Sequence, residues 1–171
     1  PVGCGDAFRR LVGKALLREN SAALKEGVGS YQLGTGVRNG AALLAKTVQT
    51  SWEARPEDAW LALDLSNAFG TLKRQAVLDR LETEGLELRH LLPHARFFLQ
   101  RPSQYRLLKP DGTAEWLQAT VGTEQGDPWG PLYYALALAP ALDSLRRALD
   151  DLAAKRQVER HEEPNRGEGL C

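Results

Sequence analysis

The chain has 171 residues, of which 43% are hydrophobic and 26% charged, a composition that argues against a disordered or fibrous polypeptide and fits one globular domain. Lysine and arginine together number 22, the same as aspartate and glutamate, so no overall positive charge attracts nucleic acid and any basic surface must be local. The longest apolar run, from Leu132 to Leu142, is too short for a membrane span.

The two cysteines, Cys4 and Cys171, lie at opposite ends of the chain and offer neither a disulfide framework nor a zinc spacing. This usage favours a reducing, intracellular compartment, so we expect the nucleus or the cytoplasm. The sequence contains no methionine and begins at Pro1, and we therefore expect a fragment of a longer protein.

The pattern of apolar residues predicts a helix-rich chain with one β-hairpin. Helical spacing, capping residues and stop signals predict helices over residues 6–26, 39–53, 71–84, 86–99 and 131–153, with Asp6, Asn39 and Thr71 as caps for the first three. A Pro-Asp-Gly turn at 110–112 joins strands at 104–109 and 113–119. The polar, charged residues 154–169 are expected to form a solvated linker.

Two local patterns suggest ligand sites that the sequence does not sustain. The stretch 34–40 superficially matches a dinucleotide-binding loop, but Asn39 stands where the third glycine should be and no strand precedes it. His90 and His94 are four residues apart on a predicted helix, but no third metal ligand is in view, so we expect surface histidines.

The stretch around Asp64 is the centre of the functional interpretation. Apolar residues 59–63 run directly into Asp64 and are followed by Ser66 and Asn67, which is typical of a short buried strand that ends in a turn. A carboxylate at the exit of a fixed strand suits Mg²⁺, which prefers oxygen ligands. An ordinary aspartate that caps the following turn is the alternative.

A second polar stretch follows about sixty residues later. It reads Thr123-Glu-Gln-Gly-Asp-Pro-Trp-Gly-Pro131 and opens directly onto the helix predicted at 131–153. Asp64-Leu-Ser-Asn-Ala-Phe69 and Gln125-Gly-Asp-Pro-Trp-Gly-Pro131, in this order, resemble the two central motifs of reverse transcriptases. The likeness is strongest to the polymerases of non-LTR retroelements, with group II intron enzymes behind, and it covers essentially the whole chain.

The resemblance implies an α+β fold, an incomplete right-hand polymerase with a short antiparallel sheet. Residues 1–58 would form fingers-like helices and a glycine-rich loop, 59–153 the two palm motifs and the hairpin between them, and 154–169 the linker. The implied activity is RNA-directed DNA polymerisation. Its implied partners are an RNA template, a DNA primer and a deoxynucleoside triphosphate, without a membrane.

Each motif residue then has an expected role. Asp64 and the carbonyl group of Leu65 would bind the metal, with two Mg²⁺ ions acting together and the remaining ligands outside this chain. The residues expected to bind the nucleotide are Leu65, Ser66, Asn67, Phe69, Gln125 and Gly126. Phe69 would lie under the sugar and exclude a 2′-hydroxyl group, with core packing as its alternative role. Arg38, Arg9 and Arg10 would contact the nucleic acid, although a solvated helix face explains Arg9 and Arg10 equally well.

The sequence also departs from the family pattern. No Asp-Asp pair on an apolar strand follows residue 153, Asp150 and Asp151 lie on a predicted helix, and Gly70 and Glu124 replace residues common in relatives. We therefore expect the isolated chain to be inactive as a polymerase, and its Asp64 strand to expose an apolar edge that promotes association. A decayed or repurposed palm remnant that binds nucleic acid or protein, and an unrelated α+β binding module, are the alternative functions.

Overall fold

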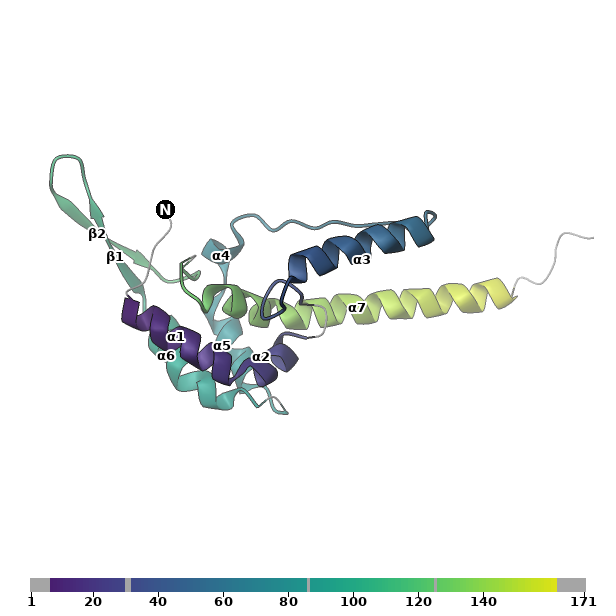
Figure 1. The fold of residues 1–171 in the computed structure, drawn as a ribbon, viewed down its shortest axis with the longest axis horizontal. Helices are drawn as coiled ribbons and strands as arrows, with labels where there is room; N and C mark the ends of the chain where they lie inside the picture. The colour runs from purple at the N-terminus through teal and green to yellow at the C-terminus, as the bar shows by residue number, and fades with distance from the viewer. Residues whose placement is uncertain (1–6, 30–31, 86, 125, 163–171) are drawn as a thin grey trace, which may run out of the picture. The chain divides into compact units, whose positions relative to one another are not determined.

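The computed structural model describes residues 7–29, 32–85, 87–124 and 126–162, and it has an α+β, helix-rich fold with a two-stranded antiparallel sheet (Figure 1). The elements in chain order are α1 (Ala7–Glu19), α2 (Ser21–Val28), α3 (Gly40–Ala54), α4 (Ala68–Thr71), α5 (Arg74–Glu82), the 3-10 helix η1 (Arg89–Leu91), α6 (Leu92–Leu99), β1 (Ser103–Leu108), β2 (Ala114–Ala119) and α7 (Gly130–Glu162). Within these ranges, no helix combines the length and the apolar character that crossing a bilayer requires.

The chain divides into two compact units, Pro1–Ala137 and Leu138–Cys171, and the hydrophobic core belongs to the first. The core forms where α2, α5, η1 and α6 meet the first turns of α7 (Figure 1). Its most completely covered side chains are Val77, Leu81, Leu88, Trp129, Tyr133 and Leu136. The buried residues of α5 and of the first turns of α7 recur at helical spacing, so each helix presents one apolar stripe to the same core.

The predicted β-hairpin is confirmed. β1 and β2 pair in antiparallel register from Ser103 opposite Ala119 to Leu108 opposite Ala114. The turn closes through the Lys109 N–H, which donates to the Thr113 carbonyl at 2.9 Å, and Gly112 supplies the positive φ of +82° that the turn requires. The Asp111 carboxylate accepts hydrogen bonds from the backbone and hydroxyl of Thr113, and these bonds lower its pKa.

Several predicted helices have different ends. The helix predicted at 6–26 is two helices, α1 and α2, separated at Asn20, whose side-chain amide donates to the Leu16 carbonyl at 2.9 Å.

Asn39 precedes α3 as predicted, but it has a φ of 56° and its side chain makes no capping bond. Thr71 ends α4 instead of capping α5. The last helix continues to Glu162, so the linker prediction is wrong for residues 154–162, where good helix formers prolong α7.

The strand predicted at 59–63 is absent. These residues lie outside any helix or strand and are exposed; Leu61 and Leu63 are 80% and 70% accessible. A strand needs a neighbour to pair its backbone groups, and the two strands of the described sheet pair only with each other. The apolar run is therefore exposed, and its expected burial was wrong.

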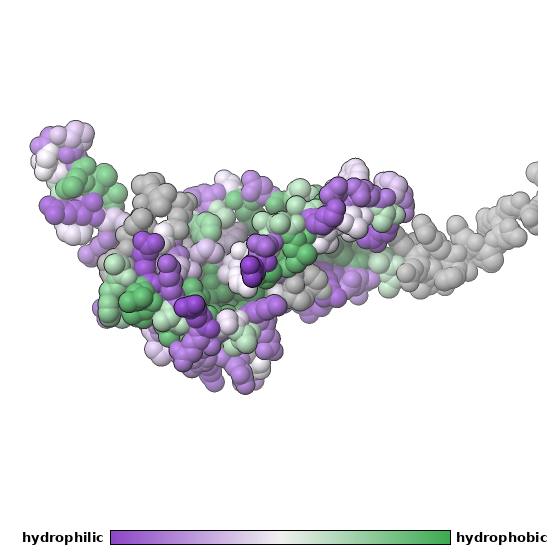
Figure 2. Space-filling view, in the orientation of Figure 1, coloured by the Kyte–Doolittle hydropathy of each residue, from purple (hydrophilic) through white to green (hydrophobic). Residues whose placement is uncertain are grey.

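Helix α3 is exposed in the same way and buries only Gly40. Its large apolar side chains, Leu43, Leu44, Val48 and Trp52, are all at least 40% accessible, and Figure 2 shows hydrophobic residues among polar ones over this helix. Trp52 contacts Trp60 of the extended segment, with ring centroids 6.1 Å apart. We call α3 together with residues 59–65 the exposed apolar region. The strand edge expected from the sequence is therefore not formed, although the apolar side chains of the same stretch are exposed.

Candidate functional site

Backbone hydrogen bonds join the segment that follows Asp64 to the segment that precedes Gln125. The Thr123 N–H donates to the Phe69 carbonyl at 2.9 Å, and the Gly122 N–H donates to the Leu72 carbonyl at 2.8 Å. Gly122 has a φ of +79°, and a Cβ atom there would lie 2.7 Å from the Gly70 carbonyl oxygen. Only glycine permits both this conformation and this approach. We call this pairing the Phe69–Thr123 junction.

The Asp64 carboxylate is exposed and, among the described residues, has no hydrogen-bond or ion-pair partner. Leu65 is also exposed, and Ser66 and Asn67 form the exposed turn that leads into α4. Asp64 therefore does not sit on a fixed strand as the sequence predicted.

The Asn67 side chain lies against Gly70 and leaves no room for a larger residue there. Its backbone has a φ of 50°, a conformation that asparagine tolerates better than most residues. A Cβ atom on Gly70 would lie 2.5 Å from the Asn67 Oδ1 atom and 2.7 Å from Nδ2. With the Asn67 amide in this position, any side chain at residue 70 would displace it.

Phe69 is half-buried and packs against Tyr134 of α7, with ring centroids 5.6 Å apart and planes tilted by 39°. Its ring therefore joins the short helix α4 to α7, while its carbonyl group forms part of the junction. This contact agrees with core packing, which the sequence analysis gave as the alternative to contact with the sugar.

The polar turn before α7 is closed by its own groups, although Gln125 itself lies outside the described residues. The Asp127 N–H donates to the Glu124 carbonyl at 3.1 Å, and the Asp127 carboxylate accepts the Trp129 N–H at 3.0 Å. A Cβ atom on Gly130 would lie 2.8 Å from the Glu124 carbonyl oxygen, so the turn folds tightly onto the helix start. Asp127 shapes this turn, and Gly126 is half-buried within it.

Arg9 lies against this turn and not on a solvated helix face. One of its terminal nitrogens is 3.3 Å from Oε2 of Glu124, the other is ion-paired with Asp127, and the guanidinium carbon lies 4.1 Å from the centre of the Phe98 ring. Arg10 and Arg38 are exposed. The structure thus separates the three predicted nucleic-acid contacts into one internally paired arginine and two exposed ones.

Arg74 was not singled out from the sequence, yet its guanidinium group binds three residues at the base of the hairpin. It donates to the Gly122 carbonyl at 2.9 Å, the Arg101 carbonyl at 2.8 Å and the Ser103 hydroxyl at 2.9 Å. Burial lowers the pKa of Arg74, while nearby Tyr105 and Glu124 act in the opposite direction. A charged residue at the start of a helix gave no sequence signal that its partners lie up to forty-eight residues away.

His94 is half-buried, so the expectation of a surface histidine is wrong for it. Its ring lies 4.7 Å from Trp129 and 5.0 Å from Phe98, and its Nδ1 atom is 3.3 Å from the Tyr133 hydroxyl. Burial lowers the pKa of His94, and the same cause strongly raises the pKa of Tyr133. Burial thus favours the neutral form of both groups under the polar turn. His90 is exposed.

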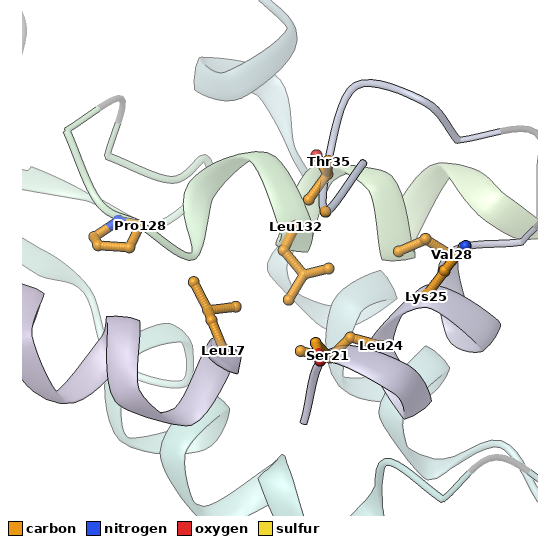
Figure 3. A pocket seen from close by; sticks show the side chains of 9 residues that line it. Leu17, Ser21, Leu24, Lys25, Val28, Thr35, Pro128 and Leu132 are labelled. Carbon is orange, nitrogen blue, oxygen red and sulfur yellow. The ribbon is translucent and has the colours of Figure 1, made fainter. Parts of the chain in front are cut away.

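A small apolar pocket with a volume of about 130 Å³ is lined by residues of α1, α2 and the start of α7, together with Pro128 (Figure 3). In Figure 3 the side chain of Leu132 points between Leu17 of α1 and Leu24 of α2. The rest of its lining comes from Ser21, Lys25, Val28, Thr35, Gly36 and Pro128. Because these walls are mainly apolar and include no carboxylate, the pocket is distinct from the predicted metal site.

The fit of Mg²⁺ to this chain rests on Asp64. A free, exposed carboxylate with a backbone carbonyl next to it is a suitable pair of oxygen ligands. Across the parts of the chain that the structure describes, no group of three or more His, Cys, Asp or Glu side chains is arranged around a common point. Asp64 and Leu65 would thus supply only part of a metal's ligands.

Comparison with known proteins gives no relative for this chain: no family model, no curated protein and no solved structure matches it.

Proposed function

We propose that this chain is part of an RNA-directed DNA polymerase in which Asp64 binds metal and the turn containing Gln125 and Gly126 contacts the incoming deoxynucleotide. The observation that carries the proposal is the Phe69–Thr123 junction. It holds the end of the Asp64 motif against the beginning of the Gln125 motif, although about fifty residues separate them in sequence. Two motifs that form one polymerase site must be neighbours in space.

The chemistry assigned to this site is transfer of a nucleotidyl group to a primer hydroxyl. The metal ions would supply activation of the primer hydroxyl and stabilisation of the leaving pyrophosphate. Asp64 and the Leu65 carbonyl group would hold a metal, and Gly126, without a Cβ atom, would allow the nucleotide to approach the backbone closely. Ser66 and Asn67 would line the nucleotide side of the same turn.

The decisive test is template-primed incorporation of deoxynucleotides in a polypeptide that contains this chain. Asp64→Ala should abolish incorporation, because the proposal assigns the metal to this carboxylate, whereas Asp58→Ala should retain it. Asp58 is the matched control, since it is an exposed aspartate six residues earlier whose pairing with Arg55 is local. Equal incorporation by the two variants would refute the metal assignment. The 171-residue chain by itself should show no incorporation.

A second test concerns the sugar. If Phe69 excludes a 2′-hydroxyl group, Phe69→Ala should admit ribonucleotides, while Phe69→Leu, which retains more of the packing against Tyr134, should admit fewer. The measurement is the ratio of ribonucleotide to deoxynucleotide incorporation by each variant. An unchanged ratio in Phe69→Ala would assign the residue to packing alone.

A second candidate function is favoured by the exposed apolar region. Leu43, Trp52, Leu61 and Leu63 lie open on α3 and residues 59–65, and apolar patches of this kind mark surfaces that bind other polypeptides. A palm remnant that binds protein would depend on these residues and would be indifferent to Asp64. Binding or association that survives Asp64→Ala but is lost on replacing Leu61 and Leu63 by aspartate would favour this function.

A further inference from the structure

The turn between Thr123 and Gly130 is held by one arginine from a distant part of the chain. Arg9 lies on α1, and its guanidinium group reaches both Glu124 and Asp127, the two carboxylates that flank Gln125 and Gly126 in the sequence. The three side chains are largely covered, with accessibilities of 20% for Arg9, 15% for Glu124 and 6% for Asp127. Charge-assisted bonds in such surroundings are stronger than those on an open surface.

Each carboxylate uses its second oxygen to contact a different element. Oδ1 of Asp127 accepts the Trp129 N–H at 3.0 Å at the start of α7, and Oε1 of Glu124 lies 3.4 Å from the Tyr105 hydroxyl on β1. A single cation on α1 is thereby connected through two carboxylates to the helix that follows the turn and to the hairpin that precedes it. Moving Arg9 would disturb both sides of the turn at once.

Helix α1 also touches this region at a second point, one helical turn after Arg9. The Trp129 indole N–H donates to the Gly13 carbonyl at 3.2 Å, and a Cβ atom on Gly13 would lie only 3.0 Å from the indole ring. On the remaining side, the Phe98 ring covers the guanidinium carbon of Arg9 at 4.1 Å. The helix and its arginine are therefore fixed against the turn from several directions.

From this geometry we infer that Arg9 is a positioning residue that fixes the conformation of the Glu124–Asp127 turn. Two carboxylates held close together repel each other, and the guanidinium group offsets that repulsion while bridging them. Without Arg9 the nearly buried Asp127 would lose its counter-charge, and the turn would open toward water. The consequence for nucleotide binding, through Gln125 and Gly126, rests on the function proposed above.

The direct test is hydrogen exchange of the full chain without nucleotide. In Arg9→Gln the peptide that covers residues 122–130 should exchange about tenfold faster or more, since removing one partner of a covered ion pair destabilises its surroundings strongly. The peptide that covers the core of α5 should change little. Arg18→Gln, an exposed arginine of the same helix, should leave both peptides unchanged and is the matched control. Arg9→Lys keeps the charge but loses the planar guanidinium group that bonds both carboxylates, so it should accelerate exchange to a smaller extent. This variant keeps the test possible if Arg9→Gln does not fold.

A charge rescue separates positioning from general support. Asp127→Asn removes one negative charge but keeps the Oδ1 acceptor for the Trp129 N–H. If Arg9 acts by offsetting the carboxylates, adding Asp127→Asn to Arg9→Gln should slow the exchange of residues 122–130 again. No acceleration at 122–130, equal acceleration in α5, or no rescue would each overturn the inference.

Nucleotide binding is measured separately from hydrogen exchange. Binding of a fluorescent deoxynucleoside triphosphate with Mg²⁺ should weaken in Arg9→Gln and persist in Arg18→Gln. Faster exchange in Arg9→Gln combined with no binding by any variant, including the unchanged chain, would support the positioning role and count against the proposed polymerase function. Unchanged exchange would overturn the positioning role whatever the binding result.

Discussion

Helices α3 and α5 combine composition and burial in opposite ways. α3 is rich in alanine and leucine and also carries Val48 and Trp52, yet it buries only Gly40. α5 is largely charged and polar, yet it buries Val77, Leu78 and Leu81 together with Arg74. The difference teaches that burial here is decided by which elements the chain brings alongside a helix. α5 packs with η1 and α6 and shares the core cluster with the first turns of α7, whereas α3 contributes no residue to that cluster among those that the structure describes.

The largest effect should come from truncating matched leucines in the two regions. Leu81→Ala removes a side chain with 0% accessibility and should lower the free energy of unfolding by about 2 to 5 kcal/mol. Leu61→Ala removes one with 80% accessibility and should change it by no more than about 0.5 kcal/mol. Urea denaturation measures both. Similar losses in the two variants would show that residues 59–65 pack onto something in solution and would break the comparison.

A smaller effect should follow at the Phe69–Thr123 junction, which links the end of the Asp64 segment to the packed region. Gly122 and Gly112 both have positive φ values, +79° and +82°, but only a Cβ on Gly122 would meet other atoms. Gly112→Ala should cost about 1 kcal/mol of unfolding free energy, the price of the left-handed conformation alone. Gly122→Ala should cost clearly more, because its Cβ would also push the Phe69 and Gly70 carbonyls away. Equal costs would mean that the junction opens easily.

The smallest effect should be a pH dependence within the packed region. Burial lowers the pKa of His94 below its ordinary value of 6.5; nearby Asp127 raises this pKa and Arg9 lowers it, and burial is the largest of these influences. As the pH falls, His94 therefore takes up a proton in the unfolded chain before it does so in the folded chain. The stability that neutral, buried His94 contributes is complete above pH 6.5 and is lost as the pH falls from 6.5 toward the lower pKa of the folded state. His94→Gln should flatten the dependence of the melting temperature on pH between about 7 and 5. An undiminished pH dependence in His94→Gln would contradict this origin.

The sequence was informative wherever the determining interactions are local. The hairpin follows from Pro110, Asp111 and Gly112, which specify a turn through their own backbone preferences, and the helices follow from apolar spacing within each segment. The turn-forming role of Asp127 was also predictable, because its Oδ1 atom bonds a backbone group only two residues away.

Long-range partners were not predictable. Nothing near Arg9 indicates that it pairs with residues more than a hundred positions later, and nothing near Arg74 indicates that it holds the base of the hairpin. The strand prediction at 59–63 was wrong for the same reason. A strand exists only with a neighbour, and a run of apolar residues carries no information about whether that neighbour is present.

Arg74 gives the hairpin a mechanical property. Because one guanidinium group grips the backbone at Arg101, the side chain of Ser103 and the carbonyl of Gly122, the two legs of β1 and β2 are anchored at a single pivot. A ligand that bound the outer end of the hairpin and tilted it would therefore act on the Arg74 hydrogen bonds. Through Gly122, the same tilt would reach the backbone bonds to Leu72 and Phe69.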